Sequence, residues 1–370
     1  MPLSLFTAEA QRRRENLTPF TLCAAAPLRF LAVFLMLPLL VSCARETPVY
    51  HQQSYVFGTL VDVTIAGEDE ARARQLTGQV LAEFDRLHRT LHAWKPSELS
   101  RLNAAFARGE RAPLSPELAA ILRDAAALSA QSGGAFNPAI GGLVKLWGFQ
   151  SDEFTPLRPD PAALAAWVKA APGMDDIVAE NGFASSRNPA VRLDLGGYAK
   201  GYALDLAAAS LRAQGVGGAL INIGGNILAI GSRGGQPWRV GIQHPRKPSA
   251  IATLELGDGE AIGTSGDYQR FFEIDGKRYC HIIDPRSGYP VQGVEAVTVL
   301  VAPGRLAGTL SDVASKPLFI AGAAGWREAA ARMGIAGALL IDARGEIHLT
   351  PAMKKRLRFT EKTPVVHEAP

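Results

Sequence analysis

The residues best suited to chemistry in this sequence are glycine-rich turns with charged side chains among them. The turns come at Gly133, Gly196, Gly224 and Gly266. Backbone N–H groups in such turns bind anions, and Lys200, His281 and several aspartates lie among them. The sequence has no G-x-S-x-G elbow and no cysteine–histidine cluster, whereas its oxygen ligands suit a hard cation such as Mg²⁺. These residues favour phosphoryl transfer on a phosphate ester or nucleotide.

The stretch Val191–Asp205 is the part of the chain around which we expect the other turns to be arranged. Val191 and Leu193 alternate with polar residues, which predicts a strand, and Gly196–Gly197 ends it before a predicted helix. A strand, a glycine turn and a helix start direct N–H groups toward an anion, with Lys200 in reach. An ordinary corner with a surface lysine has the same pattern, since neither G-x-G-x-x-G nor a P-loop is present.

Strands and helices alternate along the rest of the chain. Ser54–Ile65 is predicted as one strand, and Gly58 in its middle indicates a bulge or the close approach of a ligand. Glu68–Leu91 carries the apolar stripe of an amphipathic helix, and Gly304–Ile320 is predicted as a second long helix. Further helices are predicted at Ser97–Phe106, from a Ser115 cap, at Asp160–Val168 and at Trp326–Met333. Asp275–Gly276 is a hairpin signal, and Asp175–Ser186 is predicted as a variable connection. The alternation favours an α+β fold.

Two histidines on the first long helix, His88 and His92, have the spacing of a zinc pair. No nearby glutamate completes an H-E-x-x-H pattern. We therefore expect solvated or hydrogen-bonded histidines at these positions.

Composition and charge exclude several classes of protein. The 370 residues are 47% hydrophobic and 20% charged, which are values of a globular chain. The net charge of +4 includes four arginines within the first 30 residues. The remainder is close to balanced, so we expect no nucleic-acid partner.

The N-terminus has the pattern of a targeting segment. Arginines precede an apolar run from Phe30 to Val41 that is short for a transmembrane helix. Leu40–Cys43 resembles a bacterial lipobox, which predicts a signal peptide over residues 1–43, a lipidated Cys43 and a polar tether over residues 44–53. The alternative is a plain membrane anchor. We expect attachment to the inner membrane of a bacterium, facing the periplasm or cell exterior. Cys280 would then have no partner for an internal disulfide.

Several motifs together resemble the ApbE family, the FAD:protein FMN transferases. They are Gly58–Thr64, Ser97–Asn103, Gly133–Phe149, Asp194–Asp205, Ile221–Ile227, Thr264–Tyr268 and His281–Pro290. They occur in family order, which predicts one ApbE-like domain over residues 54–350 followed by a basic tail over residues 351–370.

The resemblance implies a fold, a reaction and partners. It implies mixed β-sheets with packed helices in two closely packed lobes, with FAD in the cleft between them and Mg²⁺ on its pyrophosphate. A threonine hydroxyl of an exported electron-transfer protein would attack the FMN-side phosphorus, and AMP would leave. Some members hydrolyse FAD or only hold it.

Site residues carried over by this resemblance fall into three groups. The FAD-binding positions are Phe57, Trp94, Ala135, Phe136, Asn137, Asp194, Lys200 and Ile282. His281 is the candidate general base or orienting group. The metal would take the backbone carbonyl of Gly197 and the carboxylate of Asp312, which is also counted as catalytic.

The chain departs from the family pattern at the metal. Lys316 stands where the resemblance implies a threonine ligand, and an ammonium repels Mg²⁺. Ser315 is one replacement ligand; alternatively, the ammonium itself pairs with the pyrophosphate. Asn137 and Asn226 stand where aspartate is common. These changes support the alternative function of an FAD-binding lipoprotein without transferase activity.

Overall fold

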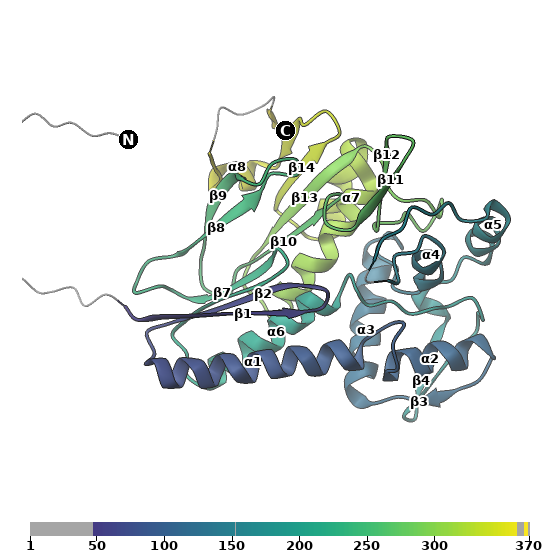
Figure 1. Cartoon of the computed structure of the whole chain (residues 1–370), viewed down its shortest axis with the longest axis horizontal. Coiled ribbons are helices and arrows are strands. Elements are labelled where there is room, and N and C mark those ends of the chain that lie inside the picture. The colour runs from purple at the N-terminus through teal and green to yellow at the C-terminus, as the bar shows by residue number, and fades with distance from the viewer. Residues whose placement is uncertain (1–46, 152, 361–365, 369–370) are drawn as a thin grey trace, which may run out of the picture. The chain divides into compact units, whose positions relative to one another are not determined.

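A nine-stranded sheet is the centre of the computed structural model, which describes residues 47–151, 153–360 and 366–368 (Figure 1). In sheet order its strands are β1 (Val49–Val56), β2 (Thr59–Ala66), β6 (Gly218–Ile223), β7 (Asn226–Gly231), β10 (Ala261–Gly266), β13 (Val294–Val301), β14 (Gly337–Asp342), β15 (Ile347–Leu349) and β17 (Val366–Glu368). All neighbours are antiparallel except β15 and β17. The predicted signal peptide, lipobox and most of the tether lie outside the described residues.

Three helices cover one face of this sheet: α1 (Glu70–Thr90), α6 (Ala199–Ala213) and α7 (Ala307–Arg332). Asp69 caps α1, and the predicted apolar stripe is buried along it. Val61, Val63 and Ile221 point into the same core from the sheet. Every second side chain of the strands therefore packs against the apolar faces of the helices. The fold is α+β, as predicted.

A smaller sheet covers the other face. Its order is β16 (Arg358–Phe359), β9 (Ala250–Leu256) and β8 (Trp238–Gln243). Helix α8 (Pro351–Arg356) packs on β14 of the large sheet. Met353 and Leu357 are buried among side chains of the large sheet. The predicted tail therefore contributes to a core as far as Phe359.

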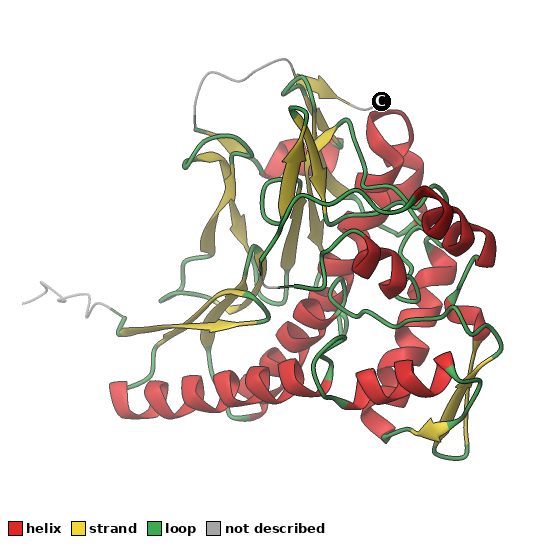
Figure 2. Ribbon diagram, turned by 45° about the vertical axis from the view of Figure 1, so that its right-hand side comes forward, coloured by secondary structure: helices red, strands yellow, loops and turns green. Residues whose placement is uncertain are grey.

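The remaining elements form the region to the right in Figure 2. They are α2 (Glu98–Ala107), β3 (Ala112–Pro113), α3 (Pro116–Gln131), α4 (Gly141–Leu146), α5 (Pro161–Ala170), η1 (Met174–Asp176), β4 (Ile177–Glu180), β5 (Phe183–Ser186), β11 (Phe271–Ile274) and β12 (Lys277–Cys280). Ser115 caps α3, and Asp275–Gly276 makes the β11–β12 turn with both φ angles positive, as predicted. The connection at Asp175–Ser186 contains the paired strands β4 and β5.

The prediction of one strand over Ser54–Ile65 is wrong. The segment is the β1–β2 hairpin, and Phe57 and Gly58 form its two-residue turn, with φ angles of 57° and 70°. Phenylalanine rarely adopts a left-handed conformation, so its presence hid the turn in the sequence.

The predicted strand at Val191–Asp194 is an extended segment outside the sheets. A single bridge pairs Arg192 with Ile140. The buried Asn103 clamps the next residue: its Nδ2 donates to the Leu193 carbonyl at 2.9 Å, and its Oδ1 accepts from the Leu193 N–H at 2.6 Å. A side chain thus supplies the hydrogen bonds that a strand neighbour would give.

Helices α6 and α7 cap each other. Neither has a cap from its own preceding side chain. Asp312 of α7 accepts from the Gly201 N–H at 3.1 Å, and Asp205 of α6 accepts from the Gly308 and Thr309 N–H groups at 2.7 and 2.8 Å. Burial raises the pKa of Asp205 to about 6 against these hydrogen bonds. Each carboxylate satisfies first-turn donors of the other helix.

Helix α7 joins two segments that the sequence predicts as separate helices. At Gly322 the backbone leaves the helical region, with φ 64° and ψ −174°. Glycine adopts this conformation at little cost, so α7 changes direction there.

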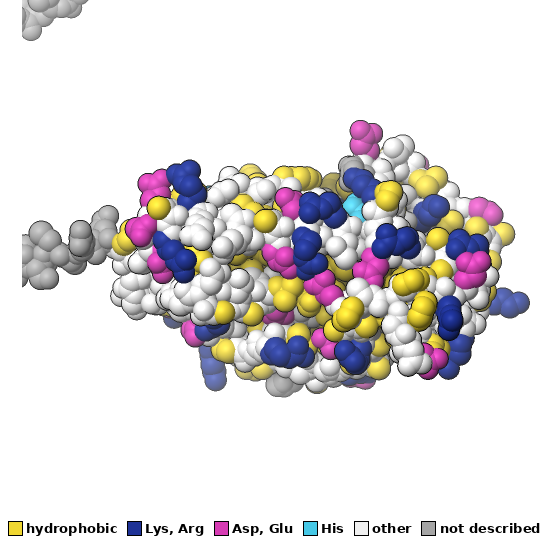
Figure 3. All heavy atoms as spheres, turned by 90° about the horizontal axis from the view of Figure 1, so that it is seen from below, with side chains coloured by type: hydrophobic (Ala, Val, Ile, Leu, Met, Phe, Trp, Pro, Cys, Tyr) yellow, Lys and Arg dark blue, Asp and Glu magenta, His cyan; other side chains and the backbone are white. Residues whose placement is uncertain are grey.

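One face of the molecule carries charged side chains of both signs (Figure 3). On the face in Figure 3, Lys and Arg side chains are interspersed with Asp and Glu. Over residues 47–151, 153–360 and 366–368, no helix is both long and apolar enough to cross a membrane.

The crossing of α6 and α7 makes a stability prediction. A Cβ at Gly201 would lie 2.4 Å from the Gly308 carbonyl oxygen. We expect Gly201→Ala to lower the free energy of unfolding by about 1–3 kcal/mol, because overpacking forces the helices apart. Urea unfolding measures this.

The matched control is Gly78→Ala, at an exposed position of α1 where a Cβ meets nothing within 4 Å. It should stabilise the chain by up to about 1 kcal/mol. Equal effects of the two substitutions would contradict the close crossing.

Candidate functional site

One cavity of about 680 Å³ collects nearly all the predicted site residues. Its wall includes Phe57, Trp94, Ala135, Phe136, Asn137, Asp194, Gly197, Lys200, His281, Ile282, Asp312 and Lys316. Ser315 is fully buried and is not part of the wall. The strands β2, β7 and β10 contribute further lining, so the cavity lies where the large sheet meets the loops around it. The volume is typical of a site for a nucleotide-sized ligand.

A row of neighbouring aromatic and imidazole rings forms one part of the cavity wall. Phe57 at the β1–β2 turn lies 5.6 Å from His88, His88 lies 5.1 Å from His92, and His92 lies 4.5 Å from Trp94, measured between ring centroids. Edge contacts of this kind fix ring orientation. The two histidines support the aromatic wall, which is a use that the zinc-pair spacing did not indicate.

The loop that carries Ala135, Phe136 and Asn137 is held by its own side chains. Asn137 Oδ1 accepts from the Ala139 N–H at 3.0 Å, and its Nδ2 donates to the Pro172 carbonyl at 2.9 Å. Both polar groups of Asn137 therefore shape the loop. Phe136 is buried beside Gly197, where a Cβ would lie 3.7 Å from its ring.

Asp194 shapes the glycine turn. Its Oδ1 accepts from the Gly196 N–H at 3.0 Å, and its Oδ2 accepts from Gln150 Nε2 at 3.2 Å. The carboxylate lines the cavity while holding Gly196 in place.

A buried charge cluster centred on Asp312 forms another part of the wall. Lys316 Nζ pairs with the Asp312 carboxylate and also donates to its carbonyl oxygen at 2.6 Å. Lys200 Nζ lies 3.8 Å from the same carboxylate and donates to the Gly196 carbonyl at 3.2 Å. The exposed fractions of the side chains are 0% for Asp312, 16% for Lys316 and 22% for Lys200.

The pKa values in this cluster follow from its charges. Burial alone would raise the pKa of Asp312, but the ammonium groups of Lys200 and Lys316 hold it below its usual range. Burial lowers the pKa of Lys316 to about 8 against the attraction of Asp312. At neutral pH the cluster holds two ammonium groups for one carboxylate.

The donor set predicted for Mg²⁺ does not fit that ion as the side chains lie. Lys316 pairs with Asp312, and its stem packs on Gly197, where a Cβ would lie 3.3 Å from Lys316 Cε. The Ser315 hydroxyl donates to the Asp312 carbonyl at 2.8 Å and shares a hydrogen bond with Ser265, also at 2.8 Å. A divalent ion placed among these groups would meet an ammonium where it needs an oxygen ligand.

His281 faces the cavity in its neutral form. The backbone N–H of His281 donates to the Arg270 carbonyl at 3.0 Å, and the imidazole Nδ1 lies 3.3 Å from the same oxygen. Burial, followed by the positive charges of Arg270 and Lys200, lowers the pKa of His281 to about 3. A neutral imidazole in this position can accept a proton.

Three lining residues had no role assigned from the sequence. Arg270, whose Nη2 donates to the Phe149 carbonyl at 2.6 Å, comes just before the β11–β12 hairpin, and Tyr268 lies nearby. Asn226 Oδ1 is buried and has no hydrogen-bond partner among the described residues. A ligand donor would satisfy Asn226, since buried polar groups are rarely left unpaired. The motifs Ile221–Ile227 and Thr264–Tyr268 contain Asn226 and Tyr268, whereas no motif contained Arg270.

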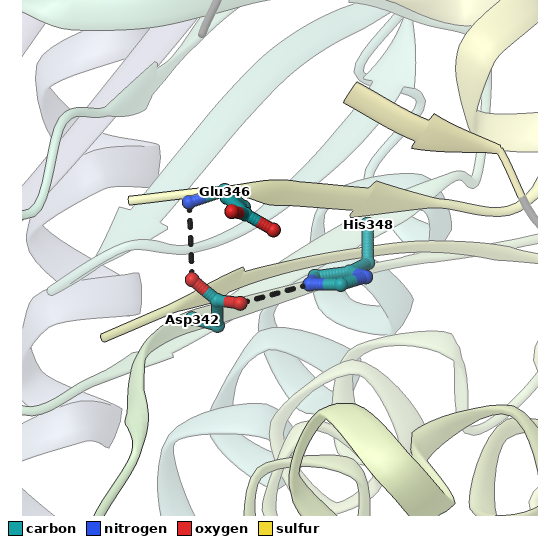
Figure 4. A group of neighbouring side chains, drawn as sticks. All are labelled: Asp342, Glu346 and His348. Carbon is teal, nitrogen blue, oxygen red and sulfur yellow. Dashed lines mark hydrogen bonds and ion pairs between the residues drawn. The ribbon is translucent and has the colours of Figure 1, made fainter. Parts of the chain in front are cut away.

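A second group of potential metal ligands lies outside the cavity, at the β14–β15 turn (Figure 4). Asp342 Oδ2 lies 3.2 Å from His348 Nε2, and Glu346 lies beside them. Arg344 already pairs with both carboxylates, at 3.2 and 2.8 Å. Arg344 therefore competes with a cation for both carboxylates, and the imidazole is a poor ligand for Mg²⁺.

Comparisons with known proteins agree on one family. Residues 57–339 match the ApbE family. An FAD:protein FMN transferase of Rhodobacter capsulatus is 42% identical over 85% of this chain and 59% of that protein. One of Klebsiella pneumoniae is 35% identical over 67% of this chain and 73% of that protein. The chain therefore spans about three fifths of the Rhodobacter relative's length.

Solved structures give the same likeness. The ApbE protein of Thermotoga maritima superposes with a TM-score of 0.77 at 28% identity, over 84% of this chain and all of that one. The flavinyl transferase ApbE of Pseudomonas stutzeri gives 0.72 at 30% identity, over 86% and 98% of the two chains.

The low pKa of His281 makes a prediction about acid stability. The fold keeps His281 neutral down to about pH 3, whereas the unfolded chain takes up this proton near pH ~6.5. Between these values the unfolded state binds more protons, so the free energy of unfolding falls as pH falls. From pH 7 to pH 5, wild type should lose about 1–2 kcal/mol more than His281→Gln. Urea unfolding at both pH values measures this; equal losses would place His281 in contact with water.

Proposed function

The chain belongs to the ApbE family, and from that premise we propose that it is an enzyme, an FAD:protein FMN transferase. It moves the FMN phosphoryl group of FAD to a threonine hydroxyl of an acceptor protein and releases AMP. The observation that carries the proposal is one cavity whose wall joins aromatic rings to paired ammonium groups. That combination suits a flavin with a diphosphate attached.

In this proposal, different residues of the cavity bind different parts of the substrate. Phe57, Trp94 and Phe136 contact the flavin, because flat aromatic surfaces bind rings. Lys200 and Lys316 bind the pyrophosphate through charge-assisted hydrogen bonds. Asn226, with its unpaired Oδ1, accepts from a polar group of the bound nucleotide.

The transfer step uses His281 as general base. The threonine Oγ attacks the phosphorus on the FMN side, and the bond from that phosphorus to the bridging oxygen breaks. The threonine proton passes to the neutral imidazole, and the bridging oxygen leaves with AMP. The ammonium groups of Lys200 and Lys316 offset the charge that develops on the phosphate oxygens. No step is assigned to Mg²⁺, because Lys316 lies among its expected ligands.

A second candidate function is an FAD-binding lipoprotein without transferase activity. Lys316 favours it, because an ammonium neutralises charge without clamping two phosphates as a divalent ion does. The two functions differ in one observable, the fate of bound FAD.

The N-terminal sequence supports a proposal about the location and the acceptor. We propose that Cys43 is lipidated and holds the protein on the outer side of a bacterial inner membrane. The acceptor is then an exported electron-transfer protein. Its threonine reaches the cavity past Tyr55, Leu60 and Trp94, which are 73%, 48% and 36% exposed. Tyr55 and Leu60 are cross-strand partners on the β1–β2 hairpin, so their side chains share one face.

The direct test of the function is the intact mass of an acceptor. The chain starting after Cys43 is incubated with FAD and a threonine-containing acceptor domain, with and without Mg²⁺. A gain of one FMN phosphoester, with AMP released, is expected. Bound FAD that stays intact under every condition would establish the second candidate instead.

Loss of the general base should slow FMN transfer and leave the affinity for FAD nearly unchanged. We expect His281→Ala to lower the rate of FMN transfer by at least about 100-fold, in the range of general base catalysis. FAD affinity, measured by flavin fluorescence, should change by about threefold or less. A matched fall in affinity and rate would show a binding role for His281.

The exposed rim makes a separate prediction for the acceptor. Tyr55→Ser should raise the KM for the acceptor several-fold, because it removes apolar contact area on the hairpin face that Tyr55 shares with the cavity-lining Leu60. FAD affinity should not change. Tyr289→Ser, at a tyrosine that is 49% exposed and lies outside the cavity wall, is the matched control. The same KM for both variants would place the acceptor elsewhere.

A further inference from the structure

We propose that the Lys316 ammonium, held by Asp312, is the built-in cation of the diphosphate site, so that FAD binds and reacts here without a divalent metal ion. The inference rests on the proposed function, because it concerns the same cavity. It replaces the metal requirement that the family resemblance implies with a side chain of this chain.

The first support is the position of the ammonium. Lys316 lies one helical turn after Asp312 on α7, and its Nζ bonds both the carboxylate and the carbonyl oxygen of Asp312. Its stem crosses Gly197, where a Cβ would lie 3.3 Å from Cε. The ammonium is therefore beside the two residues expected to ligate a metal, and it contacts one of them directly.

The second support is the charge left over. Asp312 faces two ammonium groups, those of Lys316 and Lys200, and it also accepts from the Gly201 N–H at the start of α6. One carboxylate cannot neutralise two lysines and a helix N-terminus. The excess positive charge is partly buried in a cavity wall, where an anion gains most from it.

The third support is the hydrogen-bonding capacity of the group. An ammonium has three N–H bonds, and Lys316 directs two of them to Asp312. The third is available to a phosphate oxygen that enters the cavity. Lys200, on the first turn of α6, reaches the same region from the other helix. Two lysines from two helices thus bracket the position of a diphosphate.

A purely structural role for Lys316 makes different predictions. If the ammonium only neutralised the buried Asp312, FAD binding would still depend on an added divalent ion. The dependence of FAD affinity on metal therefore separates the two roles, even before any residue is changed.

The test measures FAD affinity by flavin fluorescence and AMP release by chromatography, in EDTA and in millimolar Mg²⁺. For wild type we expect both quantities to agree within twofold between the two conditions. A tenfold or greater loss of FAD affinity in EDTA would overturn the inference.

Substitutions at position 316 sharpen the test. Lys316→Thr supplies an oxygen ligand in place of the ammonium, so FAD affinity should fall at least tenfold in EDTA and recover in Mg²⁺. Lys316→Met keeps the length without charge or ligand, so affinity should fall in both conditions. Lys145→Thr, at an exposed position on α4 outside the cavity wall, should behave as wild type. Unchanged affinity of Lys316→Thr in EDTA would overturn the inference.

Failure of the proposed function gives a different result. If wild type binds FAD but releases no AMP with any acceptor, the transferase assignment fails, and the affinity measurements still decide the role of Lys316. If FAD does not bind in EDTA or in Mg²⁺, both proposals fail.

Discussion

The close crossing of α6 and α7 is the constraint on which the site depends. Both helices begin without a capping side chain of their own, and each takes its cap from an aspartate of the other, Asp312 or Asp205. Glycine at positions 201 and 308 allows the backbones to approach. These hydrogen bonds are needed because the N–H groups in the first turn of a buried helix cannot bond to water. The same bonds bring Lys200 and Lys316 together.

The cluster around Asp312 costs stability, and this points to a functional reason for keeping it. The two ammonium groups more than offset the lost hydration of the Asp312 carboxylate, whose pKa lies below its usual range. Burial lowers the pKa of Lys316 to about 8, so the cost falls on that ammonium. Two lysines for one acid is more positive charge than burial requires. A cavity that binds a diphosphate has a use for the excess, since the ligand completes the charge balance that the empty protein lacks.

The sequence predicted those features that are encoded locally. The stripe on α1, the Ser115 cap and the Asp275–Gly276 turn each depend on neighbouring residues, and all three are present. The residues carried over by the family resemblance, Ser315 apart, all line one cavity, although no local pattern related them. Contacts between distant parts of the chain were not predictable in this way. Asn103 bonds Leu193 across 90 positions, and it replaces the strand that alternation had indicated.

The ion pair between Asp312 and Lys316 could not be predicted from the sequence either. The spacing of Asp312 and Lys316 allows a helical pair, but it does not say whether the ammonium turns to the acid or to solvent. Burial of both side chains decides this, and burial is a property of the packed fold. In the same way, the pKa of His281 is lowered first by burial and then by the charges of Arg270 and Lys200, and only the folded chain brings these together.

The turn at Phe57 has a consequence for how this protein can change over time. A phenylalanine with φ of 57° is strained by about 1–2 kcal/mol relative to glycine in the same conformation. Glycine or asparagine would relax the turn, yet neither has a ring to continue the aromatic wall toward His88. Selection for thermal stability and selection for the aromatic wall of the cavity therefore oppose each other at this position. A redesign guided by stability alone would remove Phe57 first and give a more durable protein with an open cavity wall.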